Sequence, residues 1–134
     1  MTTVLIVEDN ERNMRLMRLL LRPLGYNLLE AVDGREALDT LERTTPDIIL
    51  VDIQLPDVDG LEITRRLRKQ PRFATTPIVA LTAYAMPGDR EMFLRAGCTG
   101  YVAKPIDTRA FPGIIASYLH AAATALMPEG TQPE

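Results

Sequence analysis

Five short runs of apolar and β-branched residues recur along the chain, and segments with helical spacing separate them. The runs cover residues 4–7, 27–31, 48–51, 78–81 and 100–103. The first, third and fourth are apolar without alternation, which is typical of strands buried on both faces of a parallel sheet. The second and fifth are weaker, so we expect them at the edges. A strand followed by a helix, five times over, predicts a doubly wound α/β fold with a five-stranded parallel sheet and right-handed crossovers.

The first two helices are indicated by apolar spacing and by residues that end helices. Spacings of three and four place one set of side chains on the same face: Met14, Met17, Leu20, Leu21 and Leu24. Pro23 and Gly25 then close this helix. The second helix is expected over residues 34–43 with Ala37, Leu38 and Leu41 inward, and Pro46 separates it from the next strand.

The remaining three helices have clear signals at their ends. One follows Gly60, and another runs over about residues 88–96, where Gly97 suits a left-handed C-cap. The last carries regular apolar spacing from Phe111 to Ala122, and Asp107 or Thr108 can cap its start. Pro112 near that start predicts an irregular first turn, because a proline beyond the first turn must kink a helix or move its start.

Length and composition fit one domain and exclude several classes of protein. A chain of 134 residues with 46% hydrophobic residues can build one core, which we place over residues 1–126. Residues 127–134 are rich in proline, glycine and acid, and we expect a disordered tail. The 15 basic and 18 acidic residues form no basic stripe, so we expect no direct binding of nucleic acid.

Membrane and secreted proteins are also disfavoured. The longest apolar runs, such as residues 48–51, are far too short to span a bilayer. The single cysteine, Cys98, cannot form an internal disulfide, and the N-terminus shows no signal-peptide pattern. We therefore expect a cytoplasmic protein.

Polar residues follow four of the five predicted strands, at the edge where doubly wound sheets bind ligands. Glu8 and Asp9 follow the first strand, and the other three strands are followed by Asp52, Thr82 and Lys104. Each position alone has a simpler explanation, because Asp9 or Asn10 can cap a helix, Thr82 can begin a turn and a lysine can be solvated. Together, however, three neighbouring carboxylates repel one another unless a cation is present.

The types of residue in this group point to Mg²⁺ and to phosphoryl chemistry. The group offers oxygen ligands only, and the single histidine, His120, falls near the end of the last helix as a surface residue. Such a site favours Mg²⁺ over zinc or copper, and bound Mg²⁺ usually shares its coordination with a phosphate. Asp52 is the candidate nucleophile. Mg²⁺, the Lys104 ammonium and the Thr82 hydroxyl would each hold one phosphoryl oxygen.

Four segments together carry a resemblance to a known family. They read Val-Glu-Asp-Asn at 7–10, Val-Asp-Ile-Gln-Leu-Pro at 51–56, Leu-Thr-Ala at 81–83 and Lys-Pro-Ile at 104–106. With these segments, each at the end of its own strand, the chain resembles bacterial response-regulator receiver domains over about residues 3–125. The resemblance implies a flavodoxin-like sheet with strand order 2-1-3-4-5.

The resemblance also implies a role for each residue of the site. Asp52 would be phosphorylated, with Lys104 and Thr82 touching the phosphoryl group. Mg²⁺ would be bound by Asp52, directly by Asp9, through water or at a distance by Glu8, and by the backbone carbonyl of Gln54. The Lys104–Pro105 bond would be cis, and Pro56 and Gly60 would shape the loop after Asp52. Tyr101 would be the aromatic switch residue, with half-buried packing as the simpler alternative.

The implied partners are proteins. A histidine kinase or a His-containing phosphotransfer protein would supply the phosphoryl group, and a downstream protein would bind the face formed by the fourth helix, fifth strand and fifth helix. The segment 82–86, with Tyr84 and Met86, leads into that face. The motifs are most similar to single-domain regulators of the DivK type and to receivers within hybrid histidine kinases. A chemotaxis-type switch and a phosphorelay intermediate remain open.

Two alternatives come from other classes of protein. An aspartyl-phosphate phosphatase or phosphotransferase would need a substrate pocket, usually built by an insertion, and the chain has no long insertion. A scaffold that is never phosphorylated is disfavoured by the intact acceptor site. We therefore expect no enzyme beyond self-phosphotransfer and slow self-dephosphorylation, at a rate set by the side chains of Gln54 and Tyr84.

Overall fold

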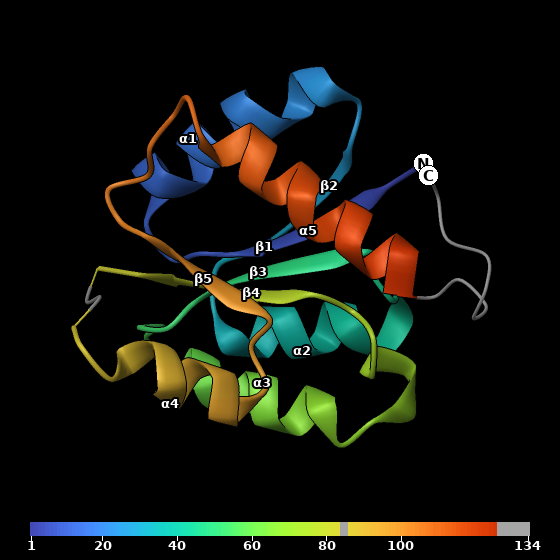
Figure 1. The fold of residues 1–134 in the computed structure, drawn as a ribbon, viewed down its shortest axis with the longest axis vertical. Coiled ribbons are helices and arrows are strands. Elements are labelled where there is room, and N and C mark those ends of the chain that lie inside the picture. Colours follow the sequence, from blue (N-terminus) through green and yellow to red (C-terminus); the bar gives the residue numbers. More distant parts are fainter. Residues whose placement is uncertain (84–85, 126–134) are drawn as a thin grey trace.

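A five-stranded parallel sheet forms the centre of the molecule (Figure 1). The computed structural model describes residues 1–83 and 86–125. Its elements are β1 (Thr3–Val7), α1 (Glu11–Leu21), β2 (Asn27–Ala31), α2 (Gly34–Arg43), β3 (Ile48–Asp52), α3 (Gly60–Arg68), β4 (Ile78–Thr82), α4 (Asp89–Ala96), β5 (Gly100–Ala103) and α5 (Phe111–Ala125), with 3₁₀ turns at Arg22–Leu24 and Pro71–Phe73. The strand order is β2-β1-β3-β4-β5, which confirms the predicted topology.

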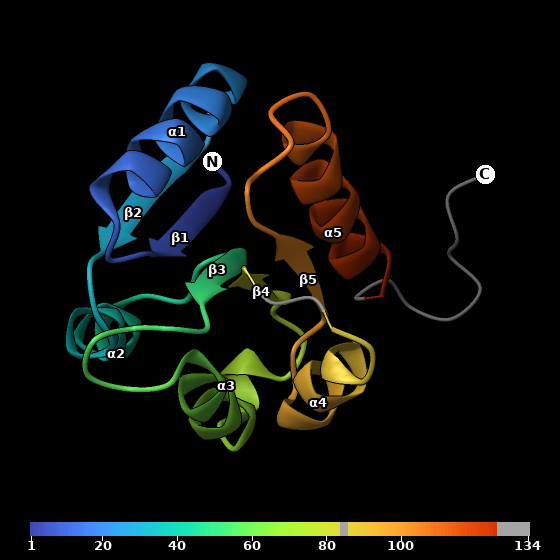
Figure 2. The same ribbon diagram turned by 90° about the vertical axis from the view of Figure 1, so that its left-hand side faces the viewer.

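The sheet lies between two layers of helices (Figure 2). Helices α1 and α5 cover one face, and α2, α3 and α4 cover the other. Successive side chains of a strand point to opposite faces, so Val4 and Ile6 join the apolar cluster under α1 and α5 while Leu5 and Val7 join the cluster on the other side. Strands covered on both faces need no polar alternation. This is why the three central strands are continuously apolar, whereas β2 and β5 form the edges.

The end of α1 corrects one prediction. Leu24 was expected on the buried face of the helix but is 49% exposed. The α-helix ends at Leu21, and Arg22–Leu24 form a 3₁₀ turn that Gly25 closes with a φ of 85°. Pro23 has no N–H to continue the helix, and the tighter turn rotates Leu24 away from the core.

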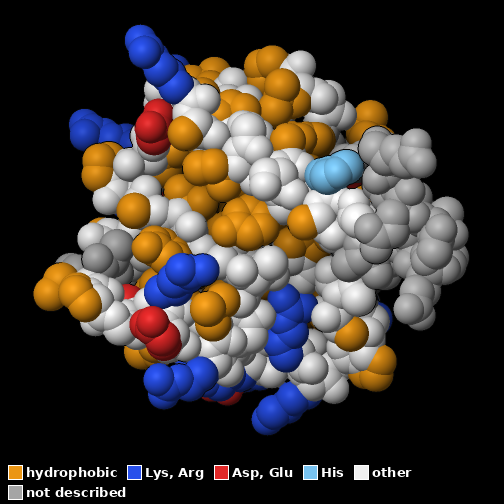
Figure 3. Space-filling model, in the orientation of Figure 1, with side chains coloured by type: hydrophobic (Ala, Val, Ile, Leu, Met, Phe, Trp, Pro, Cys, Tyr) orange, Lys and Arg blue, Asp and Glu red, His pale blue; other side chains and the backbone are white. Residues whose placement is uncertain are grey.

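Helix α5 begins after an irregular turn. One carboxylate oxygen of Asp107 accepts hydrogen bonds from the backbone N–H groups of Arg109 and Ala110, at 3.0 and 3.2 Å. The helix itself starts at Phe111, so Pro112 lies in its first turn, where no backbone donor is needed. No Asp, Glu, Lys or Arg occurs in Phe111–Ala125, and the surface over this helix is mostly hydrophobic or uncharged (Figure 3).

A hydrogen-bond network fastens the start of β5. The guanidinium of Arg68, in α3, donates to the Gly97 carbonyl at 2.8 Å and to the Thr99 hydroxyl at 3.3 Å. The Thr99 N–H donates to the carbonyl of Ile78, in β4, at 2.7 Å, and the Thr99 hydroxyl accepts the Ile78 N–H at 3.0 Å. Gly97 has the left-handed conformation predicted for it, with a φ of 109°. The end of α4 and the start of β5 are therefore held by α3 and β4.

His120 is exposed, as predicted, and Cys98 is a buried free thiol. The predicted tail at 127–134 and the loop residue Tyr84 lie outside the described residues. Within residues 1–83 and 86–125, no helix combines the length and apolar character needed to cross a bilayer.

Candidate functional site

Three carboxylates meet at the ends of β1 and β3. Glu8 and Asp9 directly follow β1, and Asp52 is the last residue of β3. The two strands are parallel neighbours with Val7 opposite Val51, so their carboxyl ends lie side by side. One oxygen from each of the three carboxylates lies within 4.8 Å of the others. The structure thus brings together the three acids that the sequence singled out.

The first helix is capped by Asn10. Its side-chain oxygen accepts the backbone N–H of Asn13 at 3.1 Å, and its backbone is extended, as an N-cap requires. The capping role that was open to Asp9 therefore belongs to its neighbour. The exposed Asp9 carboxylate takes part in the acidic cluster instead.

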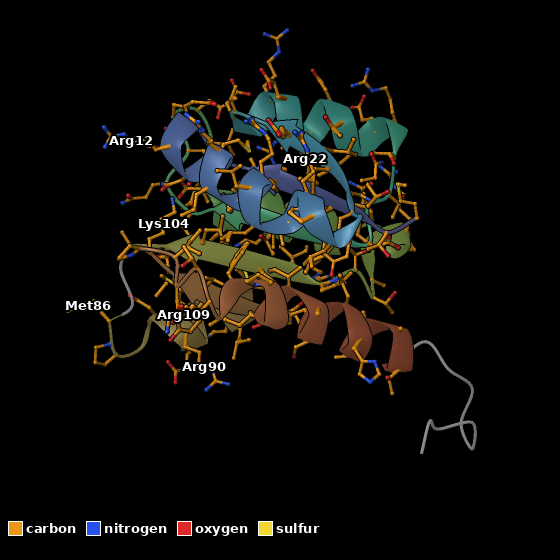
Figure 4. The ribbon with its side chains drawn as sticks, turned by 90° about the horizontal axis from the view of Figure 1, so that it is seen from above. Arg12, Arg22, Met86, Arg90, Lys104 and Arg109 are labelled. Atoms are coloured by element: carbon orange, nitrogen blue, oxygen red, sulfur yellow. The ribbon has the colours of Figure 1, made fainter. Side chains whose placement is uncertain are left out.

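Lys104 reaches the acidic cluster from the end of β5. Its ammonium lies 2.7 Å from a carboxylate oxygen of Glu8 and 3.0 Å from Oδ2 of Asp52. Burial alone would lower the pKa of Lys104, but the two carboxylates outweigh burial and raise it, so the side chain stays charged. The Lys104–Pro105 bond is cis, the isomer that the resemblance implied. Lys104 lies at the same end of the molecule as Arg12 and Met86 (Figure 4).

Asp52 is almost fully buried, at 5% exposure, and both of its oxygens have partners. Oδ1 accepts the backbone N–H of Gln54 at 2.9 Å, and Oδ2 accepts the Lys104 ammonium at 3.0 Å. Burial acts to raise the pKa of Asp52, but the Gln54 amide and the Lys104 ammonium favour the ionised form, and the pKa of Asp52 is lowered. Asp52 is therefore ionised, as a carboxylate nucleophile must be.

Glu8 is completely buried and poorly compensated. Among the described residues, neither of its carboxylate oxygens has a hydrogen-bond partner, because the close approach of Lys104 is an ion pair outside hydrogen-bond geometry. Burial, and then the neighbouring Asp52, raise the pKa of Glu8 to about 7. One ammonium thus faces two buried carboxylates, and the site lacks positive charge.

The donor set fits a hard divalent cation. Glu8, Asp9 and Asp52 offer oxygen ligands only, and the unsatisfied oxygens of Glu8 would be compensated by a nearby cation or by its bound water. Mg²⁺ prefers such oxygen ligands and keeps several waters. The residues present therefore fit the cation that the sequence predicted.

Thr82 and Tyr101 lie on the same side of the sheet. Thr82 ends β4 and is buried, one position beyond Leu81, which pairs with Asp52. Tyr101 pairs with Ala80, and the alternation of side chains places Thr82 on the face shared by Ala80 and Tyr101. The half-buried Tyr101 ring packs edge-on against Phe93, with ring centroids 5.8 Å apart. A switch role for Tyr101 stays a prediction.

Sequence reasoning missed Asp57, which ties the loop after β3 to the start of α2. Asp57, in the loop after β3, accepts the backbone N–H of Gly34 at 2.8 Å and that of Arg35 at 3.0 Å. These bonds lower the pKa of Asp57 below its usual range, and the bond from Gly34 has the largest effect. The partners are more than 20 residues apart along the chain, and no local spacing indicates such a contact.

Gly60 is required by a close approach to the backbone of Asp52. Its N–H donates to the Ile53 carbonyl at 3.0 Å, and an added Cβ would lie 2.3 Å from the backbone oxygen of Asp52. Because the clash is with backbone, we expect Gly60→Ala to lower the free energy of unfolding by about 1–3 kcal/mol. Urea unfolding measures the change.

The matched control for this substitution is Gly113→Ala. Gly113 is exposed in α5, and an added Cβ there would meet nothing within 4 Å. This variant should be more stable than the wild type by about 0.5–1 kcal/mol, since alanine favours helix. Equal stability of Gly60→Ala and the wild type would contradict the close approach.

Comparisons with known proteins point to one family. The family model described as the response regulator receiver domain matches residues 4–116. A curated relative, the polar-differentiation response regulator DivK of Brucella anthropi, is 46% identical over 117 residues, which cover 87% of this chain and 95% of the relative. The DivK protein of Brucella ovis is equally similar.

Solved structures show the same fold. The receiver domain of sensor histidine kinase PA1611 from Pseudomonas aeruginosa, which has a magnesium ion coordinated in its active-site cleft, superposes with a TM-score of 0.80 at 39% identity. The alignment covers 89% of this chain and 98% of that domain. The chemotaxis response regulator CheY4 of Vibrio cholerae gives a TM-score of 0.83 at 29% identity, over 88% of this chain and 98% of CheY4.

Proposed function

Because this chain belongs to the response regulator receiver domain family, we propose that it is a single-domain, DivK-like regulator that accepts a phosphoryl group on Asp52. The observation that carries the proposal is the buried, ionised Asp52 carboxylate with the Lys104 ammonium 3.0 Å away, beside two further acids. We assign residues 1–126 to the receiver domain. Proteins of this family act in two-component signalling rather than as classical enzymes.

The proposed reaction is an in-line displacement at phosphorus. An oxygen of Asp52 forms a bond to phosphorus while the bond from phosphorus to the donor atom, a histidine nitrogen or the oxygen of a small acyl phosphate, breaks. The donor leaves with the electron pair of that bond. The Lys104 ammonium neutralises one phosphoryl oxygen, and the Thr82 hydroxyl donates to another. Mg²⁺, when bound, would supply positive charge for the third.

The chain's own groups would hold that cation. Asp9 and Asp52 would bind it directly, Glu8 would act through water, and the carbonyl of Gln54 would complete the protein ligands. The proximity of the three carboxylates and the unsatisfied oxygens of Glu8 support this assignment. The Gln54 amide, by donating to Asp52, fixes one carboxylate oxygen and helps to orient the other.

The proposed partners are proteins in the cytoplasm. A histidine kinase or a His-containing phosphotransfer protein donates the phosphoryl group, and phosphorylation shifts the population of two surface states. The readout is binding of a downstream protein to the face formed by α4, β5 and α5. A hollow lined in part by Arg90, Tyr101 and Tyr118 lies on this face and supports the assignment.

The first test is intact-protein mass spectrometry of the wild type after incubation with acetyl phosphate, with Mg²⁺ or with a chelator. We expect a gain of one phosphoryl group only when Mg²⁺ is present, since the buried carboxylates need the cation to admit a phosphate. No gain in either condition would favour the alternative of a scaffold that works without phosphorylation. Turnover of acetyl phosphate far beyond one equivalent would favour the phosphatase alternative.

A further inference from the structure

The loop that follows the acceptor aspartate is fixed at both ends by backbone contacts. At its start, the Gln54 N–H donates to Oδ1 of Asp52, and at its end the Gly60 N–H donates to the Ile53 carbonyl. Between these points Leu55 and Val58 pack against the apolar cluster under α2 and α3. Asp57 lies between Leu55 and Val58, and its carboxylate spans the gap to α2.

Helix α2 already has an N-cap of its own. Asp33 has the extended backbone of an N-cap, and its side chain accepts the Glu36 N–H at 2.9 Å. Asp57 accepts two other donors of the same helix end, those of Gly34 and Arg35. Because Asp33 supplies the local signal for starting the helix, the second carboxylate fixes the loop more than it fixes the helix.

The loop and the helix are in tight contact at this point. An added Cβ at Gly34 would lie 3.0 Å from Cβ of Val58 and 3.2 Å from Oδ1 of Asp57. The Asp57 side chain therefore reaches the helix over a short, defined distance. Pro56 restricts the backbone between Gln54 and Asp57, so a constraint at Asp57 is passed back along a stiff segment.

We propose that Asp57 is a positioning residue for the acceptor site, which holds the Gln54 carbonyl and the Asp52 backbone in place by anchoring their loop on the N-terminus of α2. This inference rests on the proposed function, in which the Gln54 carbonyl is a ligand of Mg²⁺. Asp57 itself would contact neither the cation nor the phosphoryl group. It would act through the Gln54 carbonyl, as groups that orient the ligands of a metal ion do.

The test compares two substitutions at the same helix end, Asp57→Ala and Asp33→Ala, with Mg²⁺ as the probe in isothermal titration calorimetry. Each removes a carboxylate that caps α2, but only the first frees the loop. We expect Asp57→Ala to raise the dissociation constant for Mg²⁺ about tenfold, the lower end of the range for groups that orient metal ligands. Asp33→Ala should leave it unchanged. Asp57→Asn keeps an accepting oxygen and should stay within about threefold of the wild type.

Hydrogen exchange supplies a readout that needs no metal. Asp57→Ala should speed exchange of the amides in residues 53–59, whereas Asp33→Ala should speed exchange in α2 only. Equal effects of the two variants on Mg²⁺ affinity, or none from Asp57→Ala, would overturn the positioning role. Absence of Mg²⁺ binding by the wild type would overturn the proposed function instead, while the exchange pattern would still test the anchoring of the loop.

Discussion

The Asp52→Asn variant is expected to gain no phosphoryl group under conditions in which the wild type gains one. The exchange keeps the size of the side chain but removes the ionised oxygen that attacks phosphorus. Neighbouring acids are poor substitutes, because Glu8 is fully buried and Asp9 is exposed at the edge of the cluster. Asp52 combines an ionised oxygen with a lysine 3.0 Å away. Intact-protein mass spectrometry with acetyl phosphate and Mg²⁺ measures the result.

The matched control is Asp59→Asn, the same exchange in the same loop. Asp59 caps α3 by accepting the Leu61 N–H at 2.8 Å, and asparagine caps helices as well as aspartate does. This variant should take up the phosphoryl group like the wild type. A phosphoryl group on Asp52→Asn would move the acceptor to Glu8 or Asp9, and peptide mapping would show which.

The Lys104→Met variant should be phosphorylated about 10²–10³-fold more slowly than the wild type, the usual loss when one preorganised donor to a developing charge is removed. Methionine keeps a long side chain but carries no charge. The 2.7 and 3.0 Å contacts of the ammonium place it between Glu8 and Asp52, next to the attacking oxygen. Without it, two buried carboxylates repel each other and the phosphoryl oxygens lose a partner. The initial rate of mass gain at saturating Mg²⁺ measures the effect.

Lys69 is the control, as the other lysine in the chain. It is exposed at the C-cap of α3, away from the acidic cluster, so Lys69→Met should be phosphorylated at the wild-type rate. Urea unfolding of both variants separates a loss of rate from a loss of fold. A folded Lys104→Met protein that reacts at the wild-type rate would remove the lysine from the mechanism.

The sheet and most of the acidic site could be predicted because their signals are local. Burial of a strand on both faces appears as an unbroken apolar run, as in residues 48–51. A parallel sheet then brings the residues that follow its strands to one edge, so the sequence alone groups Glu8, Asp9 and Asp52. The sequence did not distinguish Asp9 from Asn10 as the N-cap of α1. The hydrogen bond from the Asn13 N–H to the Asn10 side chain shows that Asn10 is the cap.

Other features were not predicted. The apolar spacing placed Leu24 on the buried face, because spacing alone does not show that the chain tightens into a 3₁₀ turn at Pro23. The 3₁₀ turn at Pro71–Phe73, which buries Phe73 completely, was not predicted either. The bonds from Asp57 to α2 depend on tertiary packing, which local spacing does not encode.

Hydrogen bonds hold β5 at both ends, which limits how the strand can transmit a signal. Arg68 and Ile78 hold Thr99, immediately before the strand, and just past its other end the Lys104 N–H donates to the Thr82 carbonyl at 2.7 Å. A strand held in this way can neither slide nor pivot far along β4, so its backbone should stay nearly stationary. Tyr101 lies between the two held ends. In the proposed switch, the response of Tyr101 would therefore be a rotation of its ring, carried by a backbone that hardly moves.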